Sequence, residues 1–211
     1  MLGSAFNPPH LGHLTLAQEA FARLGLGEVL LVPTGRAPHK QIEHDPGPDV
    51  RLQMTRLAVA GDERLGVSDL ETGSDEPSYS YRTLELLREQ RPDEELFFVM
   101  GADAAAGLES WRRPERILEL ARLGVAEREG VVRSEVEAVL DHLGGAGRAE
   151  FLDMPHIEVS STMVRRRVAE GRPIRYLVPG PVAELIADRS LYGAPTSGAV
   201  PGAPRRESRP A

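Results

Sequence analysis

The chain has 211 residues, a formal net charge of −7 and 41% hydrophobic residues. This length suffices for one sizeable α/β core and leaves room for only a very small second domain. The acidic balance argues against a general nucleic-acid or anionic-membrane surface, although a local cleft can still be positive. Because there is no cysteine, disulfides, thiolate metal sites and a cysteine nucleophile are excluded. No apolar run approaches the roughly 20 residues of a membrane span and no basic-then-apolar leader is visible, so we expect a cytoplasmic protein.

Short apolar runs alternate with amphipathic stretches along the chain. Apolar residues spaced by three and four predict a first helix over residues 11–24 that stops at Gly25, and Asp49 is the expected N-cap of the next helix. The further elements expected in chain order are strands at residues 28–33, 65–69, 95–100 and 123–126, and helices at residues 51–60, 81–89, 114–121 and 134–143. The near-continuous apolarity of the strands favours a parallel sheet. We therefore expect an α/β fold, a Rossmann-like doubly wound parallel sheet in one domain over residues 1–193, with a small helical C-terminal element.

The last residues, 194–211, differ in composition from the rest. They are rich in Pro, Gly, Ala and Arg, with almost nothing to bury. This composition predicts a disordered tail, whose arginines are also able to touch a partner.

The segment G-S-A-F-N-P-P-H-L-G-H, residues 3–13, is the most informative in the chain. Small residues at Gly3 and Ser4 let a ligand approach the backbone N–H groups. His10 and His13 are three residues apart and fall on one face of the first helical turn. Two histidines without a nearby carboxylate make a poor zinc site, whereas imidazoles at a helix start suit a phosphate.

This segment resembles the signature of the nucleotidyltransferase superfamily, in which an H-x-G-H motif binds ATP phosphates. The resemblance implies that Gly3, Ser4, His10 and His13 bind ATP. It also implies that Phe6 and Asn7 contact the acceptor mononucleotide. By itself, the motif is equally compatible with pantetheine-phosphate adenylyltransferases and cytidylyltransferases.

Two further segments are similar to the nicotinate mononucleotide branch. The loop P-T-G-R-A-P-H-K, residues 33–40, looks like that branch's P-x-x-x-P-P-H-K loop, and implies that His39 and Lys40 bind the mononucleotide; the alternative is a solvated basic loop. The segment P-S-Y-S-Y-R-T-L, residues 77–84, matches the branch's P-S-Y-T-x-D-T-L and implies the same role for Ser80 and Thr83.

That second segment departs from the branch's pattern at two positions. Arg82 replaces the usual aspartate, and Ser80 replaces the usual threonine. These departures concern local geometry more than activity.

An expected strand ends at G-A-D, residues 101–103. A carboxylate at such an edge often binds ribose hydroxyls, so Gly101 and Asp103 are ATP-site candidates; the alternative is that Asp103 is a helix N-cap. Trp111 matches the branch's tryptophan after G-A-D, and an indole stacks well on a pyridine ring. A buried core tryptophan is the competing interpretation.

The segment V-S-S-T-M-V-R, residues 159–165, combines hydroxyl residues at a helix start with an arginine one turn in. Such a helix start suits an anion, although an ordinary capped helix is the alternative. The segment resembles the family's I-S-S-T-x-I-R motif. The resemblance implies that Ser160, Ser161, Thr162 and Arg165 bind the ATP triphosphate.

The resemblance to bacterial nicotinate mononucleotide adenylyltransferases covers residues 3–193. It implies transfer of AMP from ATP to nicotinate mononucleotide in NAD biosynthesis, with His10, His13 and Arg165 as catalytic residues. It also implies Mg²⁺ carried by ATP, because the sequence shows no acidic metal cage. Another phosphorylated acceptor (nicotinamide mononucleotide or pantetheine phosphate) and a non-catalytic nucleotide-binding protein are the alternatives.

The start of the chain carries a separate expectation. Only Met1 and Leu2 precede Gly3, whereas a strand has about five or six residues. Unpaired backbone groups in the middle of a sheet cost about 1–3 kcal/mol each. Three interpretations follow: a start site assigned too far downstream, a displaced first strand, or a truncated and inactive copy. We expect the first, since every later motif is in order.

Overall fold

The computed structural model describes residues 1–38, 41–127, 132–155 and 157–193. Its centre is a parallel sheet with the strand order β3-β2-β1-β4-β5-β6. The strands are β1 (Leu2–Ser4), β2 (Val29–Pro33), β3 (Leu65–Val67), β4 (Phe97–Gly101), β5 (Arg122–Ala126) and β6 (Ala149–Leu152). The predicted doubly wound parallel sheet is confirmed. The predicted disordered tail lies outside the described residues.

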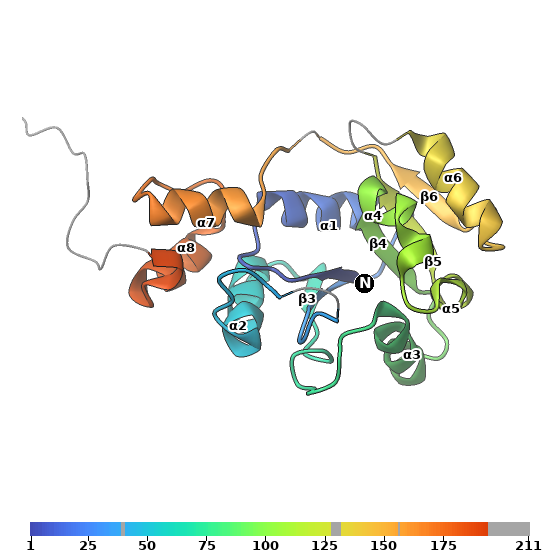
Figure 1. Ribbon diagram of the computed structural model, residues 1–211, viewed down its shortest axis with the longest axis horizontal. Helices are drawn as coiled ribbons and strands as arrows, with labels where there is room; N and C mark the ends of the chain where they lie inside the picture. Colours follow the sequence, from blue (N-terminus) through green and yellow to red (C-terminus); the bar gives the residue numbers. More distant parts are fainter. Residues whose placement is uncertain (39–40, 128–131, 156, 194–211) are drawn as a thin grey trace, which may run out of the picture.

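Helices connect the strands and cover the sheet (Figure 1). They are α1 (Leu11–Leu24), α2 (Pro48–Val59), α3 (Ser80–Gln90), α4 (Ala102–Ala106), α5 (Pro114–Leu120), α6 (Arg133–His142), α7 (Ser161–Ala169) and α8 (Gly180–Asp188), with 3₁₀ turns η1 (Leu108–Ser110) and η2 (Leu191–Gly193). In Figure 1, α7 and α8 lie at one end of the molecule and α6 lies at the other. The chain beyond β6 is therefore the small helical C-terminal element that the sequence predicts.

Most predicted boundaries agree with the structure to within one or two residues. The first helix ends at Gly25, whose φ of 61° is the left-handed conformation that glycine adopts without strain. The N-cap predicted at Asp49 is wrong: α2 begins at Pro48 after an N-cap at Gly47, and Asp49 lies in the first turn. Proline fits the first helical position because its φ is already helical and the missing N–H has no partner there.

The first strand occupies the middle of the sheet. Leu2, Gly3 and Ser4 pair in register with Leu31, Val32 and Pro33 of β2, and Leu2 also pairs with Val99 of β4. The Met1 carbonyl accepts a hydrogen bond of 2.8 Å from the amide of Val99. The interpretation of a displaced first strand is therefore wrong.

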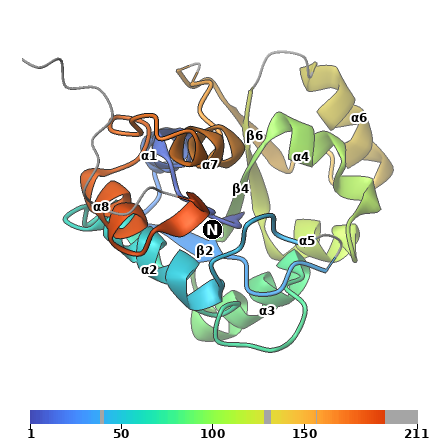
Figure 2. The ribbon, with the colours of Figure 1, turned by 60° about the vertical axis from the view of Figure 1, so that its left-hand side comes forward.

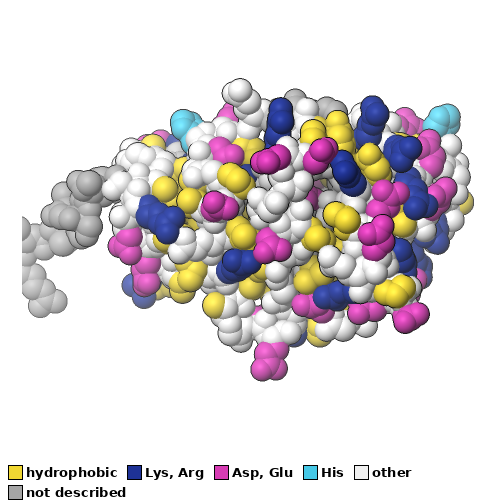
Figure 3. Space-filling view, turned by 90° about the horizontal axis from the view of Figure 1, so that it is seen from below, with side chains coloured by type: hydrophobic (Ala, Val, Ile, Leu, Met, Phe, Trp, Pro, Cys, Tyr) yellow, Lys and Arg dark blue, Asp and Glu magenta, His cyan; other side chains and the backbone are white. Residues whose placement is uncertain are grey.

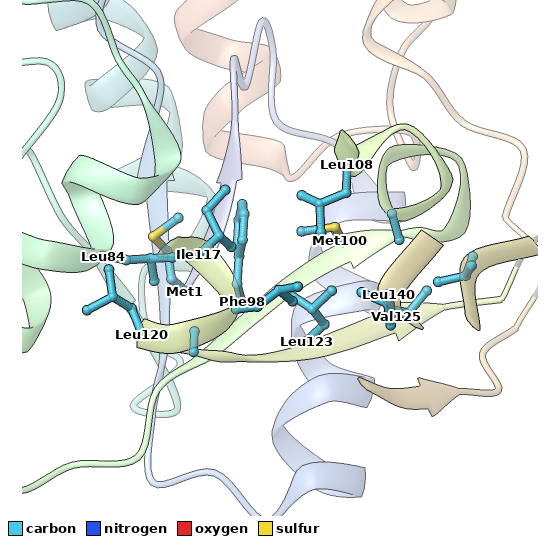
Figure 4. Close-up of a cluster of buried hydrophobic side chains, with 14 of the residues drawn as sticks. Met1, Leu84, Phe98, Met100, Leu108, Ile117, Leu120, Leu123, Val125 and Leu140 are labelled. Atoms are coloured by element: carbon cyan, nitrogen blue, oxygen red, sulfur yellow. The ribbon is translucent and has the colours of Figure 1, made fainter. Parts of the chain in front are cut away.

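The two faces of the sheet carry separate apolar clusters. One cluster buries Phe98, Met100, Leu123 and Val125 beneath α3, α5 and α6 (Figure 4). Side chains alternate between the two faces along each strand, so Leu2 of β1, Leu31 of β2 and Val99 of β4 point to the opposite face and pack against α1. A third cluster joins α2 to α7 and α8, and Figure 2 shows α8 beside α2. The C-terminal helices thus have a core of their own, anchored on the helix that follows β2.

Besides the short β1, the edge strand β6 is the strand of the described residues that the sequence pattern does not predict. Its sequence A-E-F-L contains a charged, exposed Glu150, so the run is not continuously apolar. An edge strand needs no apolar side chain on every position because one side of it faces solvent. Pairing of Leu123 to Ala126 with Ala149 to Leu152 holds it in place.

The face seen in Figure 3 carries arginine side chains interspersed with aspartate and glutamate. Exposed ion pairs among the described residues include Arg56 with Asp69 and Arg82 with Glu76. Among the described residues, no helix is both long and apolar enough to cross a membrane.

Candidate active site

A cavity of about 1140 Å³ opens where β1 and β4 end, at the point where the strand order reverses. In doubly wound sheets, ligands bind at this position. The predicted site residues that line the cavity are Gly3, Ser4, His10, His13, Gly101, Asp103, Trp111 and Ser160. Segments that lie about 150 residues apart in the chain therefore meet around one space, as the sequence motifs imply.

The two histidines of the first motif lie side by side at the start of α1. Their ring centroids are 3.8 Å apart, with the planes inclined by 34°. The His10 amide donates to Nδ1 of His13 over 3.2 Å, and Nε2 of His13 lies 3.2 Å from the Ser4 hydroxyl oxygen. Because Nδ1 accepts a hydrogen bond, the neutral ring carries its proton on Nε2. The N–H of His13 is thereby aimed at the end of β1 and at the cavity.

The environment of His13 decides its charge. Burial lowers the pKa of His13 well below 6.5, and the neighbouring His10 lowers it further. Phe6 is fully buried and its ring edge lies against His13, with 4.9 Å between centroids. His13 is therefore a neutral hydrogen-bond donor at neutral pH, not a cation.

Gly12 allows two segments to approach closely. A Cβ atom at this position would lie 3.1 Å from two atoms of the His10 ring and 3.4 Å from the Val159 carbonyl oxygen. The segment before α7 thus packs directly on the first turn of α1. The glycine in H-x-G-H is explained by this contact.

The start of α7 is joined to the loop that precedes α1. Ser160 is the N-cap, and its hydroxyl accepts from the Met163 amide over 3.2 Å. The Ser161 hydroxyl donates to the Pro8 carbonyl over 2.8 Å. Of these hydroxyl residues, Ser160 lines the cavity.

Arg165 binds the same loop. Its Nη1 donates to the Asn7 carbonyl over 2.9 Å, while Nη2 lies 3.1 Å from a Glu43 carboxylate oxygen and 3.3 Å from the Thr162 hydroxyl. The structure brings Ser161, Thr162 and Arg165 beside the loop of residues 5–10, where the Ser161 and Thr162 hydroxyls and both Nη atoms of Arg165 contact protein groups while Nε of Arg165 is buried without a hydrogen-bond partner among the described residues. Their contact with ATP stays a prediction.

At the end of β4, Asp103 lies in the first turn of α4, whose N-cap is Gly101 without a side-chain cap. The alternative interpretation of Asp103 as an N-cap is therefore wrong. The exposed carboxylate turns back toward the strand end, since a Cβ at Gly101 would lie 2.6 Å from Oδ1 of Asp103. This arrangement leaves the carboxylate free to reach the cavity, where it suits ribose hydroxyls.

Trp111 contacts both the core and the cavity, and its stacking on the mononucleotide stays a prediction. One edge packs on the buried cluster, with its centroid 6.0 Å from that of Phe98 and the planes inclined by 64°. The half-buried indole also lines the cavity. It is therefore held rigidly by the core while presenting part of its ring to a ligand.

The remaining mononucleotide candidates among the described residues do not line the cavity. Buried Asn7 accepts from the Tyr192 hydroxyl over 2.6 Å and donates to the Glu43 carbonyl over 2.8 Å. Thr83 is buried, and its hydroxyl donates to a Glu71 carboxylate oxygen over 2.6 Å. Ser80 begins α3, and Phe6 is buried beneath His13. The roles of these residues stay predictions, and His39 and Lys40 lie outside the described residues.

Sequence reasoning missed several residues that shape the site. Glu127 and Met154 line the cavity, but no motif marks them. The sequence marks Glu71 as the end of the S-D-L-E segment that resembles the branch's S-D-x-E; the structure adds that it is half-buried, and that desolvation raises its pKa although the hydrogen bond from Thr83 lowers it. Arg51 is fully buried inside a helix pattern that looks ordinary. A charged residue in a helix gives no sequence signal of burial, because the partners that make burial tolerable come from other segments.

Comparison with known proteins places the chain in a class. A family model described as cytidylyltransferase-like matches residues 1–167. The solved structure of nicotinic acid mononucleotide adenylyltransferase from Plasmodium falciparum, complexed with NaAD, superposes with a TM-score of 0.75 at 16% identity, over 91% of this chain and 95% of that one. The fold is thus that of the nucleotidyltransferase class.

Curated relatives narrow the class. A protein of Roseiflexus sp. named "probable nicotinate-nucleotide adenylyltransferase" is 40% identical over 91% of this chain and 96% of its own length. A Rubrobacter xylanophilus protein with the same name is 36% identical over 92% of this chain and 91% of its own length. The chain belongs to the nicotinate-nucleotide adenylyltransferases of the cytidylyltransferase-like family.

Proposed function

We propose that the chain transfers AMP from ATP to nicotinate mononucleotide, giving nicotinate adenine dinucleotide and pyrophosphate, as a cytoplasmic step of NAD biosynthesis. The observation that carries the proposal is the cavity at the sheet's switch point. There His13, Asp103 and Trp111 line one space, and Nε2 of His13 lies 3.2 Å from the hydroxyl oxygen of Ser4, which lines it too. The names of the relatives supply the identity of the acceptor.

The reaction makes few chemical demands on the protein. The second pKa of a phosphate monoester is about 6, so the acceptor phosphate is mostly dianionic at pH 7 and is already a nucleophile. One of its oxygens attacks the α-phosphorus of ATP in line, forming a P–O bond as the bond to pyrophosphate breaks. Catalysis then consists of positioning the two substrates and stabilising the charge that spreads over the phosphate oxygens.

Residues of this chain divide those tasks. The neutral His13, fixed by its Nδ1 contact with the His10 amide, donates from Nε2 to an α-phosphate oxygen. His10 lies against it at the start of α1, where backbone N–H groups add further stabilisation of negative charge. Arg165 and the hydroxyl groups of Ser161 and Thr162 bind the pyrophosphate and stabilise its negative charge as it leaves. The Glu43 side chain is 73% exposed, so its ion pair with Arg165 is replaced by contacts of Arg165 with the phosphates.

Mg²⁺ enters with ATP in this proposal. Within the described part of the chain, no group of three or more His, Asp or Glu side chains could hold a metal ion. Mg²⁺ commonly keeps several waters and binds substrate phosphates with one or two carboxylates, so it needs no such cage. When bound, it neutralises charge on the phosphate oxygens.

A panel of substrates tests the proposal. The purified protein is incubated with ATP or CTP and, in turn, with nicotinate mononucleotide, nicotinamide mononucleotide and pantetheine phosphate, and the products are separated by chromatography while pyrophosphate is measured. We expect efficient turnover with ATP and nicotinate mononucleotide. Preference for another acceptor or for CTP would assign a different nucleotidyl transfer, and ATP binding without pyrophosphate release would indicate a non-catalytic relative.

A further inference from the structure

Tyr192 is a half-buried residue of η2 whose hydroxyl group reaches the loop of residues 5–10. The hydroxyl donates to Oδ1 of Asn7 over 2.6 Å and lies 3.8 Å from the sulfur of Met54. Asn7 is 2% exposed, and its Nδ2 donates to the Glu43 carbonyl over 2.8 Å. Because a carbonyl oxygen accepts only from a donor, Nδ2 faces Glu43 and Oδ1 is left to accept from Tyr192. The two bonds together fix the orientation of the Asn7 amide.

The surroundings of Tyr192 hold its hydroxyl in place. Its backbone has a φ of 58°, in the left-handed region that a bulky side chain rarely adopts. Such a conformation persists only where the surrounding structure enforces it. The side chain packs on the cluster that joins α2 to α7 and α8. Burial raises the pKa of the Tyr192 hydroxyl, so it keeps its proton and remains a donor. The C-terminal element therefore sets the position of this donor.

The C-terminal element contacts the same part of the chain at further points, and α7 lies beside the start of α1 (Figures 1 and 2). Three of these contacts are hydrogen bonds to backbone carbonyls or amides: from the Ser161 hydroxyl to the Pro8 carbonyl over 2.8 Å, from Nη1 of Arg165 to the Asn7 carbonyl over 2.9 Å, and from the Leu11 amide to the Leu177 carbonyl over 3.0 Å. Tyr192 instead binds a side chain of the loop. Loss of its hydroxyl thus leaves the three backbone contacts in place.

The loop of residues 5–10 leads directly to residues that line the cavity. Phe6 precedes Asn7, is fully buried and has its ring edge against His13, with 4.9 Å between centroids. His10 ends the loop, and its amide donates to Nδ1 of His13 over 3.2 Å. Both histidines line the cavity. A shift of Asn7 therefore moves two of the contacts that orient the His13 ring.

We propose that Tyr192 is a positioning residue for the transfer reaction: through Asn7 it fixes the loop of residues 5–10, and with it the aim of the His13 Nε2–H at the α-phosphate of ATP. The inference rests on the proposed function. Tyr192 is not among the described residues that line the cavity, so it acts through the loop and not by touching substrate. A misplacement of about 1 Å costs up to about 10²-fold in rate, so a loop shift too small to unfold the protein still lowers turnover.

The test removes the hydrogen bond from each of its two ends. Tyr192→Phe deletes the hydroxyl and keeps the packed ring, whereas Asn7→Ala deletes the acceptor, and a third protein combines both changes. The matched control is Tyr176→Phe, because Tyr176 lies in the same C-terminal element, also has a left-handed backbone with a φ of 70°, and is 77% exposed. Values of kcat and of both KM are measured at a temperature at which circular dichroism shows every variant to be folded.

We expect Tyr192→Phe to lower kcat about tenfold, with each KM within about twofold of the parent, and Tyr176→Phe to match the parent. In the Asn7→Ala protein, adding Tyr192→Phe should lower kcat by less than about twofold, because the acceptor is already missing. A parental kcat in either Tyr192→Phe or Asn7→Ala would overturn the proposal. So would an equal loss on adding Tyr192→Phe to the parent and to Asn7→Ala, or a loss shared by Tyr176→Phe.

The parent protein separates this inference from the proposed function. If the parent makes no dinucleotide from ATP and nicotinate mononucleotide, the proposed function fails before any variant is compared. If the parent is active and Tyr192→Phe matches it in kcat, the function stands and the positioning role of Tyr192 is wrong.

Discussion

The sharpest expectation concerns the proton on Nε2 of His13. Replacing His13 by asparagine puts an amide oxygen near the former Nδ1, where it can still accept from the His10 amide 3.2 Å away, but it removes the donor that faces Ser4 and the cavity. Loss of one preorganised donor to a developing phosphate charge costs about 2.7–4 kcal/mol, or roughly 10²–10³ in kcat. We expect His13→Asn to lose turnover by that factor while keeping its fold.

The matched variant is His13→Gln, whose longer side chain brings an amide N–H to the former position of Nε2. We expect it to recover part of the turnover that His13→Asn loses. The assay is kcat for dinucleotide formation with both substrates saturating, together with circular dichroism and thermal unfolding. A folded His13→Asn protein with near-parental kcat would refute the reasoning, as would a glutamine variant no better than the asparagine variant.

The lowered pKa of His13 also gives a stability prediction. Because the folded pKa lies below 6.5, the folded state disfavours the protonated ring; the stability is fully present above about pH 6.5 and is lost as the pH falls toward the folded pKa. His13→Asn cannot titrate in this range. The free energy of unfolding of the parent, measured relative to this variant by urea titration, should therefore decrease below pH 6.5. A difference that stays constant between pH 7.5 and 5 would contradict the assigned burial.

Three further expectations follow from the site. Trp111→Ala should raise KM for the mononucleotide more than KM for ATP, because a stacked aromatic face is worth about 0.5–1.5 kcal/mol beyond area burial; Trp111→Phe is the control, and equal effects on both substrates would favour a purely structural role. Glu71→Gln should become more stable relative to the parent as the pH rises from 4 to 7, because desolvation raises the pKa of Glu71 and the parent loses unfolding free energy as the pH passes that raised value. Urea titrations at both pH values measure the difference in unfolding free energy, and a difference that does not change with pH would contradict this prediction. Gly35→Ala should destabilise the fold by about 2 kcal/mol or more, since its Cβ would lie 2.0 Å from the Glu71 carbonyl oxygen; thermal unfolding measures the loss, and a parental melting temperature would exclude the clash.

Local sequence signals determined the architecture because they act within single segments. Apolar runs such as residues 28–33 and the spacing of residues 11–24 are decided by side-chain periodicity, so β2 and α1 appear where the sequence predicts them. The H-x-G-H segment is also predictable from local sequence, because the helix start and the three-residue spacing bring His10 and His13 together. Charge at an edge strand breaks that periodicity, which is why β6 escapes prediction.

Only the tertiary structure decided which polar groups are buried and what they hold. Burial makes His13 neutral, places Glu71 beside Thr83, and gives Arg51 acceptors from two separate loops. Local sequence patterns predict none of these features, because the free energy of a buried charge depends on partners that lie far away in sequence. The sequence thus determined where phosphate chemistry belongs in the fold, while packing of distant loops decided the protonation, orientation and spacing of the groups available to perform it.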